Sequence, residues 1–133
     1  MNKQILIERL RKFGLRIITM VEYLPDKRLS NVIANQILRS STSIGANYRA
    51  VCRAKSRKDF INKLKIVEEE TDETLYWLEL IEDAKLFTPE RIINLKKESE
   101  ELLSIFVSSL KTSKLHLNQT PEKVLKPKLH IQS

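Results

Sequence analysis

The scarcity of glycine and proline is the feature that most narrows the folds open to this chain. Only two glycines and four prolines occur in 133 residues, which leaves little material for tight turns. A chain with few turns must fold into a few long elements. At this length it can bury one hydrophobic core, in a single domain.

Apolar residues recur every three or four positions in four successive segments, which is the spacing of amphipathic helices. The first segment runs from about residue 2 to residue 24 and ends at Pro25. Ser30 or Asn31 is predicted to cap the second helix, which continues to about Ala54. The predicted inward-facing residues of these two helices are Leu6, Leu10, Phe13, Ile17, Met20, Val21, Leu24, Ile33, Ile37, Ser41, Ile44, Tyr48 and Val51.

The third and fourth helices carry capping signals at their starts. Ser56 followed three residues later by Asp59 is close to a capping box, and this helix is predicted to end near Leu86. Thr88-Pro89-Glu90 suits the first turn of the fourth helix, predicted to end near Thr112. The predicted inward-facing residues are Phe60, Leu64, Val67, Thr71, Leu75, Leu78, Ile81, Ile92, Leu95, Leu102, Ile105, Phe106 and Leu110.

Four helices with short connections predict an all-α fold, an antiparallel up-down-up-down four-helix bundle over residues 1–112. Residues 113–133 have no helical periodicity, and two prolines lie there among lysine, serine, glutamine and asparagine. This composition predicts a disordered basic C-terminal tail.

The residues give little support to catalysis, metal binding or a cofactor. Both histidines, His116 and His130, fall in the predicted tail, and no Glu-x-x-His pair of the kind used in bundle metal sites occurs. Two glycines cannot build a phosphate-binding loop. A glutamate acid–base site competes with a solvated acidic face at Glu68 to Glu73, and the solvated face is favoured. We therefore predict no enzyme activity and no cofactor.

The predicted compartment is the cytoplasm. No stretch reaches the eighteen or so apolar residues of a membrane span, and charges interrupt the first residues, so no signal peptide is predicted. The single cysteine, Cys52, cannot form an internal disulfide, which fits a reducing compartment.

The net charge is +7, and the charges are unevenly distributed along the chain. Residues 1–54 hold ten Lys and Arg against three Asp and Glu, whereas residues 55–87 hold six against nine. Such a chain can bind a polyanion through a basic face, or pair basic and acidic faces between copies of itself. The sequence leaves both interpretations open.

Basic residues cluster around the end of the second helix and the start of the third. This cluster is the candidate nucleic-acid-binding site, because such affinity depends chiefly on charges that contact phosphates. A solvated rim, or salt bridges to another subunit, would use the same residues. The candidates are Arg39, Arg49, Arg53, Lys55, Arg57, Lys58, Lys63 and Lys65.

A second apolar line follows the third helix, about 100° around from its core stripe. Ile66, Trp77 and Leu80 form this line and lie near two acids, Glu70 and Glu73. These five residues are the candidate oligomer interface, with an apolar centre and a charged rim. The alternative is that a wide apolar arc merely suits a central helix.

The middle of the second helix is rich in small residues, from Ser40 to Ala46. Hydroxyl residues and glycine lower helix propensity here, so the segment must serve packing. We predict a close helix crossing within the bundle. Asn47, beside the core stripe, is predicted to make a hydrogen bond that fixes register.

Two blocks of the sequence resemble the 23S rRNA intervening-sequence protein family. The segment ANQILRSSTSIGANYRA, residues 34–50, resembles the family's second helix. The segments AKSRKDF, KLKIVEEE and TLYWLE, which begin at residues 54, 63 and 74, resemble its third. The resemblance implies a bacterial four-helix protomer that forms a ring-shaped homopentamer without established enzyme activity. The chain is also similar to the basic, pentameric accessory variability proteins of diversity-generating retroelements, which bind a reverse transcriptase and nucleic acid.

These observations together predict a non-enzymatic homo-oligomer, a ring of five by the resemblance, that binds RNA or DNA through basic helix faces. The alternative is a protein-interaction scaffold, or an accessory subunit of a partner such as a reverse transcriptase. No membrane partner is predicted.

Overall fold

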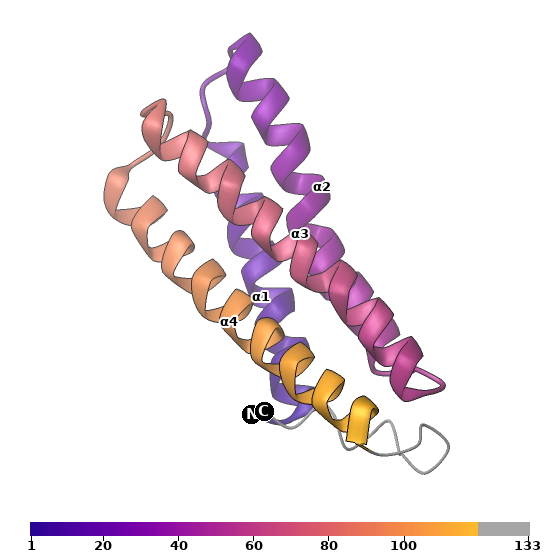
Figure 1. Ribbon diagram of the computed structural model, residues 1–133. Coiled ribbons are helices and arrows are strands. Elements are labelled where there is room, and N and C mark those ends of the chain that lie inside the picture. Colours follow the sequence, from indigo (N-terminus) through magenta and orange to yellow (C-terminus); the bar gives the residue numbers. More distant parts are fainter. Residues whose placement is uncertain (120–133) are drawn as a thin grey trace.

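The structure, a computed structural model, describes the backbone of residues 1–119 and the side chains of residues 1–117. It consists of four helices, and residues 1–119 contain no strand. The all-α prediction is confirmed (Figure 1). The helices are α1 (Lys3–Glu22), α2 (Arg28–Val51), α3 (Arg57–Asp83) and α4 (Pro89–Gln119).

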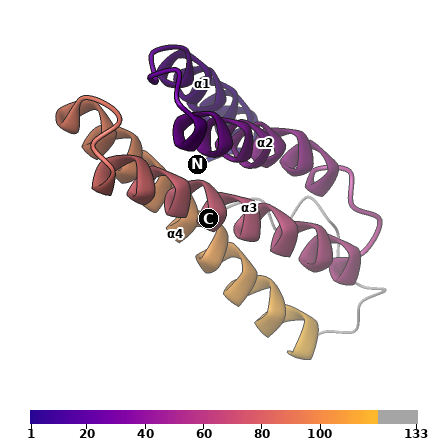
Figure 2. The same cartoon turned by 90° about the horizontal axis from the view of Figure 1, so that it is seen from above.

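Helices that follow one another in the chain run in opposite directions and pack side by side (Figure 1). The pairs α2–α3 and α3–α4 make the most extensive contacts, and α1 packs chiefly on α2. Seen from above, α1 and α2 lie on one side of the bundle and α3 and α4 on the other (Figure 2). The contact between α1 and α4 is sparse.

Side-chain caps begin two of the helices. The Asn2 side chain accepts a hydrogen bond from the backbone N–H of Ile5 at 2.8 Å, and the Ser56 hydroxyl accepts one from the N–H of Asp59 at 3.0 Å, as predicted. The predicted start of α4 at Pro89 is confirmed. Each cap satisfies a backbone donor that has no partner within the helix.

The start of α2 differs from the prediction. The helix begins at Arg28, and Lys27 at the N-cap position makes no side-chain cap. Ser30, a predicted cap, is buried inside the first turn. The amide of Asn31, the other candidate, donates to Asp26 at 3.1 Å. Packing on the bundle therefore stabilises this helix start without a local cap.

The ends of α3 and α4 also differ from the predictions. Helix α3 ends at Asp83, and Lys85, two residues later, has the left-handed backbone conformation with φ 56°. Helix α4 continues past Thr112 to Gln119, because Ser113 and Leu117 prolong the inward spacing. The rest of the predicted tail, residues 120–133, lies outside the described residues.

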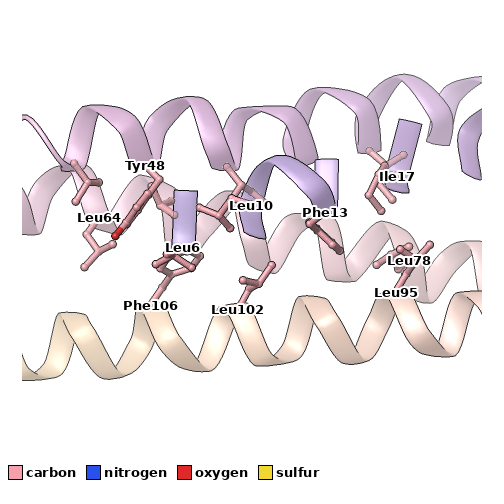
Figure 3. Packing of buried hydrophobic residues seen from close by; sticks show 14 of the residues in the cluster. Leu6, Leu10, Phe13, Ile17, Tyr48, Leu64, Leu78, Leu95, Leu102 and Phe106 are labelled. Atoms are coloured by element: carbon pink, nitrogen blue, oxygen red, sulfur yellow. The ribbon is translucent and has the colours of Figure 1, made fainter. Parts of the chain in front are cut away.

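One core runs along the bundle, and each helix contributes a single stripe to it (Figure 3). The rings of Tyr48 and Phe106, at the left in Figure 3, have centroids 6.0 Å apart. The predicted stripes are confirmed, except that Val21, Leu24, Leu75 and Ile105 are only partly buried. The labelled side chains of Figure 3 are Leu6, Leu10, Phe13, Ile17, Tyr48, Leu64, Leu78, Leu95, Leu102 and Phe106.

The small residues of α2 do not all serve the purpose predicted for them. Ser40 fits the prediction, since its buried hydroxyl meets that of Thr74 on α3 at 2.8 Å. The Asn47 amide, however, donates to the Ser43 carbonyl of its own helix at 2.8 Å, so it fixes no register between helices. A Cβ atom on Gly45 would meet only the Leu10 Cβ, at an ordinary 3.8 Å. Packing within the bundle therefore does not require Gly45.

An ion-pair cluster joins α1 to α4, two helices whose backbones come close at few points. Arg9 donates from Nε and Nη2 to the two carboxylate oxygens of Glu98, at 2.7 and 2.8 Å. Its Nη2 also donates to Glu101 at 2.8 Å. The hydrogen bonds from Arg9 hold the pKa of Glu98 below its usual value despite the opposing effect of burial.

Replacing Arg9 with methionine tests this cluster. We expect Arg9→Met to lower the free energy of unfolding by about 1–2 kcal/mol at neutral pH, because a part-buried carboxylate loses two charged hydrogen bonds. The pKa of Glu98 is lower in the folded state, so the stabilisation is present above the unfolded pKa and disappears as the pH falls through the folded pKa. Urea denaturation at neutral and acidic pH measures both effects.

Lys12→Met is the matched control, since Lys12 is an exposed residue of α1 that makes no ion pair among residues 1–117. It should leave stability nearly unchanged at both pH values. An equal loss of stability in the two variants would show that the ion pairs of Arg9 do not stabilise the fold specifically.

Candidate nucleic-acid interface

The antiparallel arrangement gathers positive charge at one end of the bundle. The start of α1, the end of α2, the start of α3 and the end of α4 all lie there, at the bottom of Figure 1. Residues 1–7, 49–67 and 102–117 contribute ten lysines and arginines, and their only acid is Asp59. We call these three segments the basic end.

The helices bring charges that are distant in sequence close together at this end. Burial raises the pKa of the Cys52 thiol, and the nearby charges of Lys3 and Arg53 oppose that shift. Lys3 belongs to α1, whereas Cys52 follows the last residue of α2. The two helix ends therefore share one positive surface.

The turn between α2 and α3 is built around Asp59. Its carboxylate accepts from the Lys63 ammonium at 2.7 Å and from the Lys55 backbone N–H at 3.0 Å. These two bonds hold the pKa of Asp59 below its usual value, and the bond from Lys63 has the larger effect. The acid at the basic end is thus engaged within the protomer, and exposed cations such as Arg53 and Lys65 make no ion pair within residues 1–117.

The eight predicted nucleic-acid residues fall into different surroundings. Exposed side chains without an ion pair among residues 1–117 are those of Arg49, Arg53, Lys55 and Lys65, and Lys58 is also exposed. Lys63 is paired with Asp59, as described above. The fold also brings to this end Lys3, Lys111 and Lys114, three residues that lie far from the predicted cluster in the sequence. Their inclusion follows from the antiparallel order and from the continuation of α4 beyond Thr112.

Arg39 lies away from the basic end and is engaged by α3. Its guanidinium pairs with Glu70 at 3.3 Å and with Glu73 through a short contact. Glu73 also accepts from the indole N–H of Trp77 at 3.1 Å. The hydrogen bonds of Arg39 and Trp77 lower the pKa of Glu73. Arg39 therefore joins α2 to α3.

The contacts of Arg39 involve two residues of the predicted oligomer interface. Glu70 and Glu73 bind Arg39 of their own chain. Trp77 and Leu80 are partly buried against the core, which matches the wide apolar arc of a central helix. Of the five residues, only Ile66 is an exposed apolar side chain.

Arg57 is buried, in contrast to its neighbours in the turn. It is 1% exposed, and none of its guanidinium nitrogens has a hydrogen-bond partner within the described chain. It precedes Phe60 and Ile61 on the inward face of α3, and desolvation lowers its pKa. A side chain in this position cannot serve as a solvent-exposed phosphate contact.

The described residues hold no cluster of metal ligands. No group of three or more His, Cys, Asp and Glu side chains among them can hold a metal ion. His116 is exposed near the end of α4, and His130 lies outside the described residues. None of the helices described here is long and apolar enough to cross a membrane.

Comparison with known families agrees with the helix pattern. The family model for the 23S rRNA-intervening sequence protein matches residues 2–108. The chain belongs to this family. The family match covers all of α1, α2 and α3 and most of α4.

A solved structure similar to this family member comes from Bacteroides thetaiotaomicron. It is a protein with unknown function from the S23 ribosomal protein family, 39% identical, with a TM-score of 0.73. The similarity covers 79% of this chain and 97% of that chain. A comparison with curated proteins found no match.

Replacing Arg57 tests whether its charge is uncompensated. We expect Arg57→Met to raise the free energy of unfolding by about 1 kcal/mol or more, because methionine fills similar space without burying a charge. Arg53→Met, in the exposed part of the same turn, should change it little. Both are measured by urea denaturation. A loss of stability in Arg57→Met would show that the guanidinium has an anionic partner.

Proposed function

We propose that this protein is a non-enzymatic, self-associating helical bundle that binds nucleic acid through its basic end. The observation that carries the proposal is the distribution of charge. The three segments gathered there hold ten lysines and arginines, seven of them exposed, and one acid that is engaged within the protomer. Phosphate backbones are the polyanions that such a surface attracts most strongly.

The mode of binding that we propose is contact with the phosphate backbone. The aromatic residues of the basic end, Tyr48 at its border, Phe60 and Phe106, are all buried in the core. They offer no platform on which bases could stack. Long, exposed lysine and arginine side chains can follow the backbone without reading the sequence. The binding should therefore be strongly salt-dependent and only weakly selective for sequence.

RNA is the first nucleic acid to test. The family's name refers to intervening sequences of 23S rRNA, and the similar structure carries the name of a ribosomal protein family. These names supply a reason to begin with structured RNA. The proposal places the protein in the cytoplasm, where RNA and a reducing environment occur together.

Self-association is the second part of the proposal. The family resemblance implies a ring-shaped homopentamer. The described surface carries exposed apolar side chains on all four helices. Repeating the basic end around a ring would multiply weak phosphate contacts, since linked sites bind with a high effective concentration.

A protein partner, such as a reverse transcriptase, is the alternative. A groove between α1 and α2 with exposed apolar walls favours it, because such grooves accept helices. Salt separates the two possibilities: phosphate binding weakens steeply as salt rises, whereas an apolar interface does not.

Reversing three charges at the basic end tests nucleic-acid binding. The triple variant Arg53→Glu, Lys55→Glu and Lys111→Glu should bind a structured RNA at least about tenfold more weakly, with a salt slope reduced by about three. All three side chains are exposed, so helicity should be unchanged. Fluorescence anisotropy at several salt concentrations measures affinity and slope.

The matched control reverses three exposed cations near the opposite end, with Lys27→Glu, Arg28→Glu and Lys85→Glu. It carries the same net charge as the triple variant. An equal loss of affinity in both variants would mean that overall charge, and not the basic end, governs binding. Unchanged affinity in the first variant would remove the basic end from the function.

A further inference from the structure

The groove between α1 and α2 is a surface that the bundle leaves uncovered. Its volume is about 540 Å³, and apolar side chains predominate along its walls. Leu15 is 54% exposed and Ile18 is 40% exposed on the α1 side. Gly14, Ser41 and Gly45 also line it, so the groove has small residues on both helices.

The glycines of the groove have no evident role inside the protomer. Neither has a positive φ. A Cβ atom on Gly14 would meet nothing within 4 Å, and one on Gly45 would make only the ordinary contact with Leu10. Glycine inside a helix costs about 1 kcal/mol relative to alanine. Because nothing in the protomer requires this cost, the glycines keep room for something outside it.

Ser41 provides an independent indication of an absent partner. It lines the groove and is 1% exposed, and its hydroxyl has no hydrogen-bond partner within the described part of the chain. A buried hydroxyl without a partner carries a desolvation cost. Rotation of the Ser41 side chain toward the groove would let an occupant that offers a polar atom remove that cost.

The outward face of α3 has the properties of such an occupant. Its exposed residues follow the spacing of one helix face, with Tyr76 at the centre of an acidic row: Glu69, Asp72, Tyr76, Glu79 and Asp83. Glu69 and Asp72 make no ion pair among residues 1–117. We call these five residues the α3 stripe. A tyrosine in such a row offers both an apolar ring and a hydroxyl.

The groove and the α3 stripe match in charge and length. Arg49 lies at the groove without an ion pair among residues 1–117 and would face the carboxylates of the stripe. Arg11 also lies at the groove and pairs with Glu8 of its own helix at 2.9 Å. The groove extends from Gln4 to Ile18 along α1, and the stripe from Glu69 to Asp83 along α3. Each spans fourteen residue steps, or about 21 Å of helix.

We propose that the α3 stripe of one copy docks in the α1–α2 groove of the next. The inference rests on the self-association in the proposed function and identifies the surfaces that make it. The two surfaces differ, so the contact is heterologous, and every copy offers one of each. Repetition of this contact produces a ring if the rotation closes and a filament if it does not.

Two surface variants and a control test the contact. The groove variant is Leu15→Glu with Ile18→Glu, and the stripe variant is Asp72→Lys with Tyr76→Lys. The control, Ile93→Glu with Val107→Glu, changes α4 residues that are 42% and 44% exposed. Light scattering coupled to size exclusion should show an oligomer for the parent and the control and a monomer for each surface variant. Circular dichroism checks that all remain helical.

Mixing the two surface variants gives the sharpest result. The groove variant keeps an unchanged α3 stripe, and the stripe variant keeps an unchanged groove. One contact can therefore form between the two variants, and the two altered surfaces that remain cannot form another. We expect a one-to-one heterodimer and nothing larger. A groove or stripe variant that keeps the parent's mass, or a mixture that remains monomeric, would overturn the inference while leaving self-association intact. A monomeric parent would overturn both.

A gentler variant covers the case in which a charged variant fails to fold. Gly14→Ala with Gly45→Ala should raise the melting temperature, because both positions accept a Cβ atom and alanine favours the helix. The same methyl groups would fill the floor of the groove and weaken self-association at least about tenfold. A more stable protein with unchanged self-association would contradict the proposed contact.

Discussion

Each helix buries one apolar stripe in a single shared core, and this constraint fixes how every helix is rotated about its own axis. The rotation in turn decides which charges find a partner. Arg39, on the flank of α2, meets the acids of α3, whereas Arg49, ten residues further along, makes no ion pair among residues 1–117. The outer surface of the protein is therefore largely a consequence of its interior packing.

The interior of the fold could be predicted from the sequence, and the helix ends less well. Three- and four-residue spacing is a strong signal for the buried face, so nearly every predicted core residue is buried. A serine near the start of a predicted helix is an ambiguous signal, because Ser56 caps its helix whereas Ser30 is buried within the first turn. The end of α4 was missed because Ser113 continues the buried face as a polar residue.

The candidate site could be predicted only in part, since sequence shows the number of charges and not their partners. The exposed cations of the α2–α3 turn were found because they are close together in the chain. Arg57 belongs to the same run, but its position on the inward face of α3 buries it. Lys3 and Lys111 were missed because only the packing of the helices brings them to that end.

The sparse contact between α1 and α4 affects how the chain folds. Every extensive contact joins helices that are consecutive in sequence, so the contact order is low and folding should be fast. The segment from α2 to α4 can form as two successive hairpins before α1 docks. Native-state hydrogen exchange should then distinguish the helices. The amides of α1 should exchange through openings of lower free energy than those of α3, because α3 has helices packed on two sides.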